Sequence, residues 1–141
     1  YTGLKQPPFL IIGGDEDATH KAAELYSHIY NSECEFILTD AVTAEVSKYS
    51  ENFFLALKVS WANDLKRICE KTGADFWKMM NAVTHDPRIG KSHTHVYETP
   101  GWGGRCLPKD LSALLAEVGD EVAPLLAAVI EANKIHRGEN V

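Results

Sequence analysis

The chain of 141 residues lacks a long apolar run, an extended basic run and any CxxC motif. A membrane-spanning helix needs about 20 apolar residues, and no secretory signal pattern is present, so the sequence predicts no membrane association. Lys and Arg total 14 against 20 Asp and Glu, which gives a net charge of −6. This acidic balance without a basic patch speaks against nucleic acid and acidic membrane surfaces as partners.

Cysteine is scarce, which argues against a fold that is held together by disulfides or by cysteine-bound zinc. The three cysteines, Cys34, Cys69 and Cys106, are widely spaced and odd in number, a pattern that disfavours a disulfide framework or a zinc ribbon. We therefore expect a reducing, cytoplasmic setting. The chain starts at Tyr1 without a methionine, and its last helical pattern reaches Val141, so we expect a piece excised from a longer protein.

The first 40 residues have an α/β pattern. An apolar run at 9–12, closed by Gly13, is typical of a buried strand. A helix is predicted over 15–30, and Glu35–Thr39 is predicted as a second strand, so the two strands should pair in parallel. Ala22, Leu25 and Ile29 would form an apolar stripe along one face of this helix. Because two strands alone make a poor sheet, we interpret this segment as the end of a larger sheet.

The remaining residues have a helical pattern. Apolar residues recur at three- and four-residue steps from Ala41 to Thr72, and the pattern stops at Gly73. A helix of roughly 30 residues is about 45 Å long; one small core cannot cover it, so we expect its second face to form a homodimer. Further elements are predicted as a helix over 75–83, a long loop over 84–104, a helix from Pro108 to Val118, and a last helix that starts near Pro124 and runs out of the chain. The predicted fold is mainly α: a helical dimerisation domain over 41–141 with one very long helix, preceded by a β-α-β remnant of a Rossmann-type α/β domain over 1–40.

The densest group of chemically active residues is the segment Gly101–Asp110, with the sequence GWGGRCLPKD. Its glycines leave room for a ligand to approach the backbone. Cys106 lies just before the predicted helix, and Lys109 follows three residues later. A helix N-terminus and a nearby cation both favour a thiolate over a thiol. We therefore predict that Cys106 is a nucleophile, whereas Cys34 and Cys69 are predicted to be buried and inert.

Other polar residues allow two interpretations each. Lys48 and Asn52 share a helix face, and they either form a solvated surface or aim a cation and an amide at a developing oxyanion. Asp110 either complements the charge at its helix start or orients a water or a lysine. Arg88 either holds a phosphate bidentately or is an ordinary surface arginine. Four cations against one acid, Glu98, between residues 88 and 109 indicate either a small anionic ligand or a chance surface cluster.

Two superficial motifs are rejected. His93 and His95 would share a face on a strand, but no third ligand has a persuasive spacing, so we predict no metal site. The glycines of Gly101–Cys106 superficially match GxGxxG, yet the last position is cysteine and no strand precedes it. We therefore predict no dinucleotide fingerprint in this segment.

Four stretches carry a resemblance to a known family: Ala44–Asn52, Cys69–Asp75, Asp86–Gly90 and Gly101–Asp110. In this order and at this spacing they resemble the UDP-glucose/GDP-mannose dehydrogenase family. The resemblance implies that residues 1–40 are the last α/β unit of an NAD-binding domain, and that the region after Pro124 leads to a nucleotide-binding domain. It implies an enzyme that oxidises UDP-glucose to UDP-glucuronate in two NAD-dependent hydride transfers. The fragment alone would be inactive.

The resemblance also implies roles for single residues. Cys106 would attack the C6 aldehyde to give a thiohemiacetal and then carry a thioester that water hydrolyses. Lys48 and Asn52 would stabilise the oxyanions, and Asp110 would position the hydrolytic water. Arg88 would reach the nucleotide sugar bound in the neighbouring subunit. The sugar site would also be lined by Tyr97, Gly101 and Gly103. The NAD cofactor would lie against Cys106 and Lys109.

The sequence leaves alternatives open both for the sugar that is oxidised and for the class of function. UDP-N-acetylmannosamine enzymes typically have histidine before the cysteine, where this chain has Arg105, so UDP-glucose is preferred over that sugar and over GDP-mannose. Dehydrogenases of the β-hydroxyacid or 6-phosphogluconate type share the Lys-x-x-x-Asn pair but need no nucleophilic cysteine, so the cysteine motif speaks against them. A helical dimerisation module without chemistry is the alternative outside enzymes. The loop before Cys106 is slightly longer than in UDP-glucose enzymes and contains Ser92–His95, so contacts there do not transfer one by one.

Overall fold

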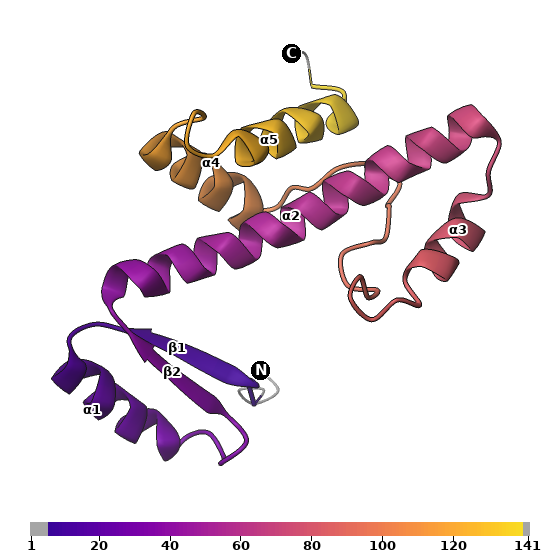
Figure 1. Cartoon of the computed structure of the whole chain (residues 1–141). Coiled ribbons are helices and arrows are strands. Elements are labelled where there is room, and N and C mark those ends of the chain that lie inside the picture. Colours follow the sequence, from indigo (N-terminus) through magenta and orange to yellow (C-terminus); the bar gives the residue numbers. More distant parts are fainter. Residues whose placement is uncertain (1–5, 140–141) are drawn as a thin grey trace. The chain divides into compact units, whose positions relative to one another are not determined.

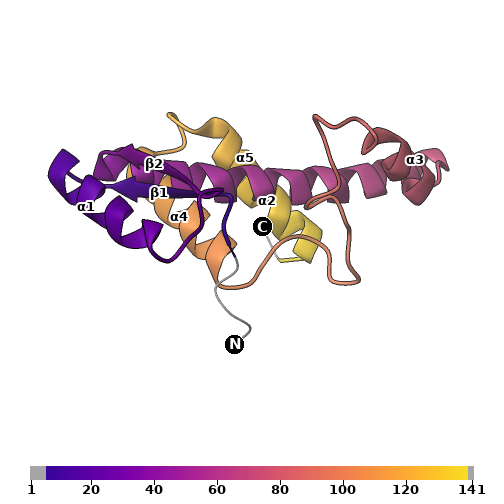
Figure 2. The same cartoon turned by 90° about the horizontal axis from the view of Figure 1, so that it is seen from below.

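The structure, a computed structural model that describes residues 6–139, is mostly helical, with the element order β1–α1–β2–α2–α3–α4–α5 (Figures 1 and 2). It divides into two compact units, within residues 1–48 and 49–141. Among the described residues, none of the helices combines the length and the apolar character that crossing a bilayer requires.

The first unit is a strand–helix–strand arrangement. Strands β1 (Phe9–Gly13) and β2 (Glu35–Thr39) pair in parallel, with Ile11 opposite Ile37 at the centre. Helix α1 (Glu16–Ser27) connects them and lies along the pair (Figure 1). The predicted parallel pair and both predicted strands are therefore confirmed.

Helix α1 is shorter than predicted, and part of its apolar face is exposed. The prediction of a helix over 15–30 is wrong at its C-terminal end, because α1 ends at Ser27. Asp15 is the N-cap, and its side chain accepts a hydrogen bond from a backbone N–H at 2.8 Å. Of the residues predicted along its apolar face, Leu25 is 62% exposed and Ile29, just after the helix, is 52% exposed. Two strands offer too little surface to cover the whole face of a helix.

Helix α2 (Ala41–Thr72) has the bounds that the sequence predicts. At its start the Asp40 carboxylate accepts hydrogen bonds from the Thr43 hydroxyl at 2.6 Å and the Thr43 N–H at 2.9 Å, and these bonds lower the pKa of Asp40. At its end Gly73 has a φ of +78°, the left-handed conformation that commonly terminates helices. Local chemistry therefore fixes both ends of this long helix.

The second unit has a core formed by three helices. Helices α4 (Cys106–Val118) and α5 (Pro124–Arg137) lie side by side and pack on one side of α2 (Figures 1 and 2). The buried members of this core are Ala56 from α2, Trp102, Leu111 from α4, and Leu126 and Val129 from α5. This core brings the first turn of α4 against α2 and thereby places the segment around Cys106.

A second core lies at the other end of the same unit. Helix α3 (Phe76–Val83) packs Phe76 and Met80 against Ala62 and Cys69 of α2. Asp75 caps α3 by accepting from the Lys78 N–H at 3.0 Å. Residues 84–105 then form no regular element, and the predicted long loop is confirmed.

Two helix ends differ from the prediction. Helix α4 begins at Cys106, so Pro108 is its third residue and not its first. A proline is tolerated there because the N–H groups of the first turn have no partner within the helix. Helix α5 was predicted to run out of the chain, but it ends at Arg137, where Gly138 has a φ of +68°. Val141 lies outside the described residues.

Candidate active site

The candidate nucleophile is exposed at the start of a helix. Cys106 is the first residue of α4 and is exposed, whereas Cys34 and Cys69 are buried. Gly104, two residues earlier, has a φ of +82°, and no heavy atom lies within 4 Å of where its side chain would begin. The thiol is therefore exposed to solvent at the end of a helix that favours negative charge.

A buried carboxylate lies one turn further along α4. Asp110 is only 1% exposed, although carboxylates are rarely buried without partners. The Asn52 amide of α2 donates a hydrogen bond to Asp110 Oδ2 at 2.6 Å. The Lys109 ammonium donates to the other oxygen, Oδ1, and forms an ion pair with it. The two carboxylate oxygens are thus bound by donors from two different helices.

Lys109, three residues after Cys106 on α4, is the ion-pair partner of this carboxylate. Its side chain is 67% exposed, so its charge stays in contact with solvent. Hydrogen bonding to Asp110 is the main cause that raises the pKa of Lys109 above its ordinary value of 10.5, and the charge of Asp110 adds to it. Tyr49 and Cys106 contribute in the same direction. The ammonium is therefore protonated at neutral pH, near both the thiol and the carboxylate.

The structure thus brings Asn52, Lys109 and Asp110 into direct contact beside Cys106. Lys48 lies four residues before Asn52 on α2 and is exposed, so the two side chains share a helix face. Asp110 had two interpretations on sequence grounds. Asp110 is buried and accepts a hydrogen bond from Asn52, 58 positions earlier in the sequence. Charge complementarity at the start of α4 requires neither feature.

The glycine segment before Cys106 is held by polar side chains that the sequence analysis did not identify. Asn63 accepts from the Gly101 N–H at 3.2 Å, and the Trp102 indole N–H donates to the Ser60 hydroxyl at 2.9 Å. Asn133 of α5 binds both backbone groups of Trp102. In the sequence, these residues are marked only as polar side chains on helix faces that are otherwise apolar.

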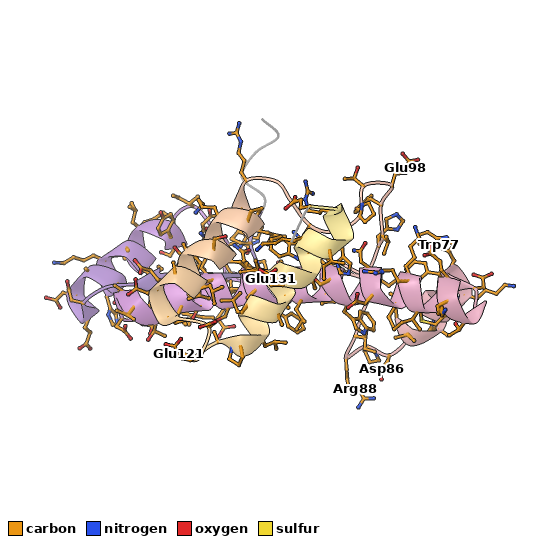
Figure 3. All side chains as sticks on the ribbon, turned by 90° about the horizontal axis from the view of Figure 1, so that it is seen from above. Trp77, Asp86, Arg88, Glu98, Glu121 and Glu131 are labelled. Carbon is orange, nitrogen blue, oxygen red and sulfur yellow. The ribbon has the colours of Figure 1, made fainter. Side chains whose placement is uncertain are left out.

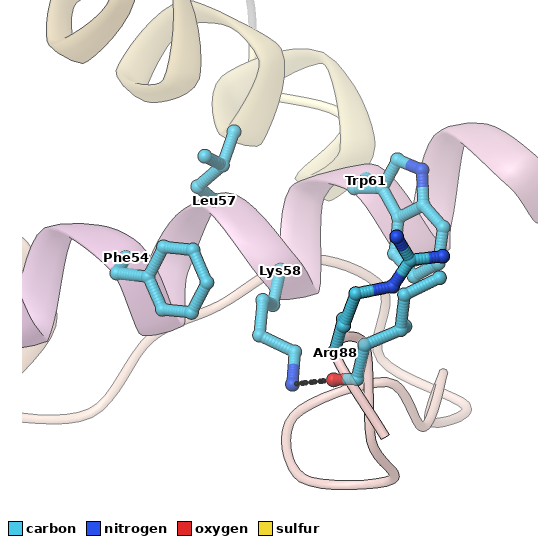
Figure 4. A pocket seen from close by; sticks show the side chains of 6 residues that line it. Phe54, Leu57, Lys58, Trp61 and Arg88 are labelled. Carbon is cyan, nitrogen blue, oxygen red and sulfur yellow. Dashed lines mark hydrogen bonds between the residues drawn. The ribbon is translucent and has the colours of Figure 1, made fainter. Parts of the chain in front are cut away.

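Arg88 lies in a different part of the second unit. With a side chain 87% exposed, it binds Asp86 through Nη2 at 2.6 Å and Nε at 3.0 Å, which lowers the pKa of that carboxyl. Figure 3 shows the pair on one side of α2 and Trp77 on the other. Arg88 also lines a pocket of about 260 Å³ whose wall is mostly apolar, with Phe54, Leu57, Lys58, Trp61 and Ile89 (Figure 4).

Tyr97 is also exposed, at 68%, in the loop before the glycines. Its ring contacts His95 edge-on at a centroid distance of 4.7 Å, and His95 in turn contacts Trp77 at 5.2 Å. His95 therefore takes part in an aromatic cluster. Within residues 6–139, no group of three or more His, Cys, Asp or Glu side chains is arranged to hold a metal ion.

Comparisons with known proteins place this arrangement in a family. Residues 42–135 match the central domain of the UDP-glucose/GDP-mannose dehydrogenase family. The chain belongs to this family. The resemblance drawn from the four sequence stretches is thereby confirmed, and the matched region contains Cys106, Asn52 and Asp110.

Members of this family with assigned names are similar to the chain over most of its length. A UDP-glucose 6-dehydrogenase from Rickettsia bellii is 34% identical over 131 residues, which are 91% of this chain and 30% of that protein. The structure of a UDP-glucose dehydrogenase from Pyrobaculum islandicum superimposes with a TM-score of 0.80 at 30% identity, over 92% of this chain and 30% of that one. A UDP-D-ManNAc dehydrogenase from Pyrococcus horikoshii gives a TM-score of 0.78 at 28% identity, over 92% and 29%.

The chain therefore spans about three tenths of the length of these dehydrogenases. The two superpositions differ by only 0.02 in TM-score although the two enzymes are named for different sugars. The fold of this region is therefore shared by family members that are named for different sugars.

Proposed function

We propose that the complete protein oxidises the C6 alcohol of UDP-glucose to the carboxylate of UDP-glucuronate, and that this chain supplies the nucleophile. One observation carries the proposal: an exposed Cys106 begins α4 one turn before a buried Asp110, which binds Asn52 and Lys109. A helical module without chemistry has no need to bury a carboxylate beside an exposed thiol. The names of the relatives support the choice of UDP-glucose.

The residues around Cys106 fit a dinucleotide cofactor. NAD, when bound, would supply the oxidant that removes a hydride from C6 in each of the two oxidations. Cys106 is exposed, no heavy atom lies within 4 Å of where a side chain at Gly104 would begin, and Lys109 presents an exposed cation on the same turn of α4. This chain would therefore provide one wall for the cofactor.

The chain's own contribution begins with a covalent bond to the sugar. The Cys106 thiolate would bond to the C6 aldehyde carbon while the carbonyl electrons move to oxygen, which gives a thiohemiacetal. After the second hydride leaves, the sulfur holds a thioester. A water oxygen then bonds to the acyl carbon, the C–S bond breaks, and the sulfur leaves as thiolate. Such a covalent intermediate divides a difficult oxidation into easier steps.

Neighbouring side chains would stabilise charge during these steps. Lys48 and Asn52, on one face of α2, would stabilise the negative oxygen of each tetrahedral species, since donors fixed in advance are most effective there. Asp110 would orient the hydrolytic water and accept its proton. Gly101, Gly103 and Tyr97 would line the sugar, and Arg88 would reach the substrate of a neighbouring subunit.

The stoichiometry of NADH tests this proposal. The complete protein, supplied with NAD and UDP-glucose, is expected to release two NADH per sugar, because alcohol to carboxylate is a four-electron oxidation. GDP-mannose and UDP-N-acetylmannosamine are assayed in parallel by absorbance at the NADH band. One NADH per sugar would rule out the thioester route. Faster turnover of either other sugar would keep the mechanism and correct the substrate.

We also infer that the chain forms a homodimer through α2. Phe54 is 58% exposed on α2 beside the apolar pocket that Arg88 lines (Figure 4). Exposed apolar surface of this kind commonly marks an interface. A second copy of the chain that binds there would lie close to Arg88 of the first copy.

Sedimentation of this chain tests the homodimer. The wild-type chain of 15.6 kDa is expected to sediment as a dimer, and Phe54→Lys is expected to sediment as a monomer because a charge cannot enter a dry interface. Val122→Lys, at a position 69% exposed between α4 and α5, is the matched control and should remain dimeric. A monomeric wild-type chain at high concentration would refute this interface.

A further inference from the structure

Asn133 binds the backbone of the glycine segment in an unusual way. Its Oδ1 accepts from the Trp102 N–H at 2.7 Å, and its Nδ2 donates to the Trp102 carbonyl at 3.0 Å. The side chain is buried on α5, and Trp102 itself is 6% exposed. The Asn133 amide thus satisfies both the backbone N–H and the backbone carbonyl of Trp102. In a β-sheet, a neighbouring strand would supply these two hydrogen bonds.

The same helix face determines the path of the two flanking glycines. A side chain at Gly101 would begin 2.5 Å from Asn133 Oδ1 and 2.9 Å from Arg137 Cγ, and one at Gly103 would begin 3.1 Å from Arg137 Nη1. Gly101 also has a φ of +80°, which other residues rarely adopt. At Gly101 the backbone therefore lies directly against α5 and leaves no room for a side chain. A side chain at Gly103 would require Arg137 to shift.

We propose that Asn133 is a positioning residue for the substrate site: it fixes the backbone of Gly101–Gly103, and with it the approach of the sugar to Cys106. This inference rests on the proposed function, in which these glycines line the sugar. Asn133 itself is buried and acts only through Trp102. Cys106 follows Gly103 by three residues. A shift of the Gly101–Gly103 backbone would therefore move the residues that line the sugar relative to the Cys106 sulfur.

We call the two hydrogen bonds between Asn133 and the Trp102 backbone the clamp. Nearly isosteric substitutions of Asn133 test it. Asn133→Leu removes the donor and the acceptor and leaves both backbone groups of Trp102 buried without a partner. Asn133→Asp keeps the acceptor but sets a carboxylate oxygen against the Trp102 carbonyl. When that carboxyl is protonated, its O–H can donate to the carbonyl and restore the clamp. Burial favours the protonated form, so this occurs nearer to neutral pH than for an exposed aspartate.

Kinetics of the complete enzyme provide the main test. Asn133→Asp is expected to lower kcat for the nucleotide sugar about 100-fold at the pH optimum, a loss typical of a misplaced site, with the KM for NAD unchanged. The ratio of its kcat to that of the wild type should rise as the pH falls, because protonation restores the donor. Asn81→Asp, at an exposed position on α3, is the matched control and should show a constant ratio near one. An Asn133→Asp ratio that stays flat with pH, or a wild-type kcat in Asn133→Leu, would overturn the inference.

Amide hydrogen exchange separates this inference from the proposed function, since it needs no substrate. Exchange at the Trp102 N–H is expected to accelerate at least about tenfold in Asn133→Leu relative to the wild type, because that substitution removes the oxygen that accepts from this N–H. Unchanged exchange would overturn the inference even in an active enzyme. Accelerated exchange in a protein that oxidises no nucleotide sugar would support the clamp and would count against the proposed function alone.

Discussion

Replacing Cys106 with alanine is expected to lower the turnover of UDP-glucose by the complete protein at least about a thousandfold, because loss of a covalent nucleophile removes the whole route through the thioester. The exposure of Cys106 and its place at the start of α4 are the physical reasons for choosing this residue. Steady-state release of NADH measures the loss. The substitution removes little volume at an exposed position, so the thermal unfolding midpoint should stay close to that of the wild type.

The other cysteines provide internal controls for this prediction. Cys69→Ala opens a small cavity in the core beside α3, and Cys34→Ala does so in the first unit, so both should lower stability and leave kcat nearly unchanged. Brief treatment of the native chain with iodoacetamide should label Cys106 first, as peptide mass spectrometry would show. Equal labelling of all three cysteines, or wild-type turnover by Cys106→Ala, would remove the nucleophile from the mechanism.

The parts of the fold that were predictable from sequence are those with local causes. Helix α2 has the predicted ends because Asp40 and Gly73 mark them chemically, and such caps depend only on residues a few positions away. The two strands were predictable from short apolar runs closed by turn residues. The start of α4 was not, because a proline is acceptable in several positions of a first turn and therefore does not fix the first residue.

The candidate site could be predicted only in part. Residue types and spacing pointed to Cys106, Lys48 and Asn52, and the cluster GWGGRCLPKD suggested the chemistry. The contact between Asn52 and Asp110 spans 58 positions, and no local pattern encodes which helices meet. The exposure of Leu25 shows the same limit in reverse, because periodicity shows which face is apolar but not whether a partner covers it.

Asp110→Asn is expected to stop the reaction at its last chemical step. The substitution preserves shape, and the Asn52 amide can still donate to the side-chain oxygen, but the negative charge that would accept a proton from water is lost. General-base catalysis typically contributes about 10²–10⁴-fold, so we expect steady-state kcat to fall by about that factor. The Lys109 pKa should also decline toward its ordinary value, since Asp110 is the main cause of its rise.

Pre-steady-state measurements distinguish this loss from a general defect at the Asp110 site. If hydrolysis is the impaired step, Asp110→Asn should release a burst of about two NADH per active site and then stall, and intact-protein mass spectrometry should show a sugar adduct on Cys106. Asp120→Asn, which removes an exposed carboxylate after α4, is the matched control and should turn over normally. Absence of both the burst and the adduct would mean that Asp110 acts before the thioester forms, and wild-type turnover would exclude it from catalysis. The burial of Asp110 between Asn52 and Lys109 makes the stalled thioester the expected result, because that carboxylate is the one buried acid among the described residues beside the nucleophile.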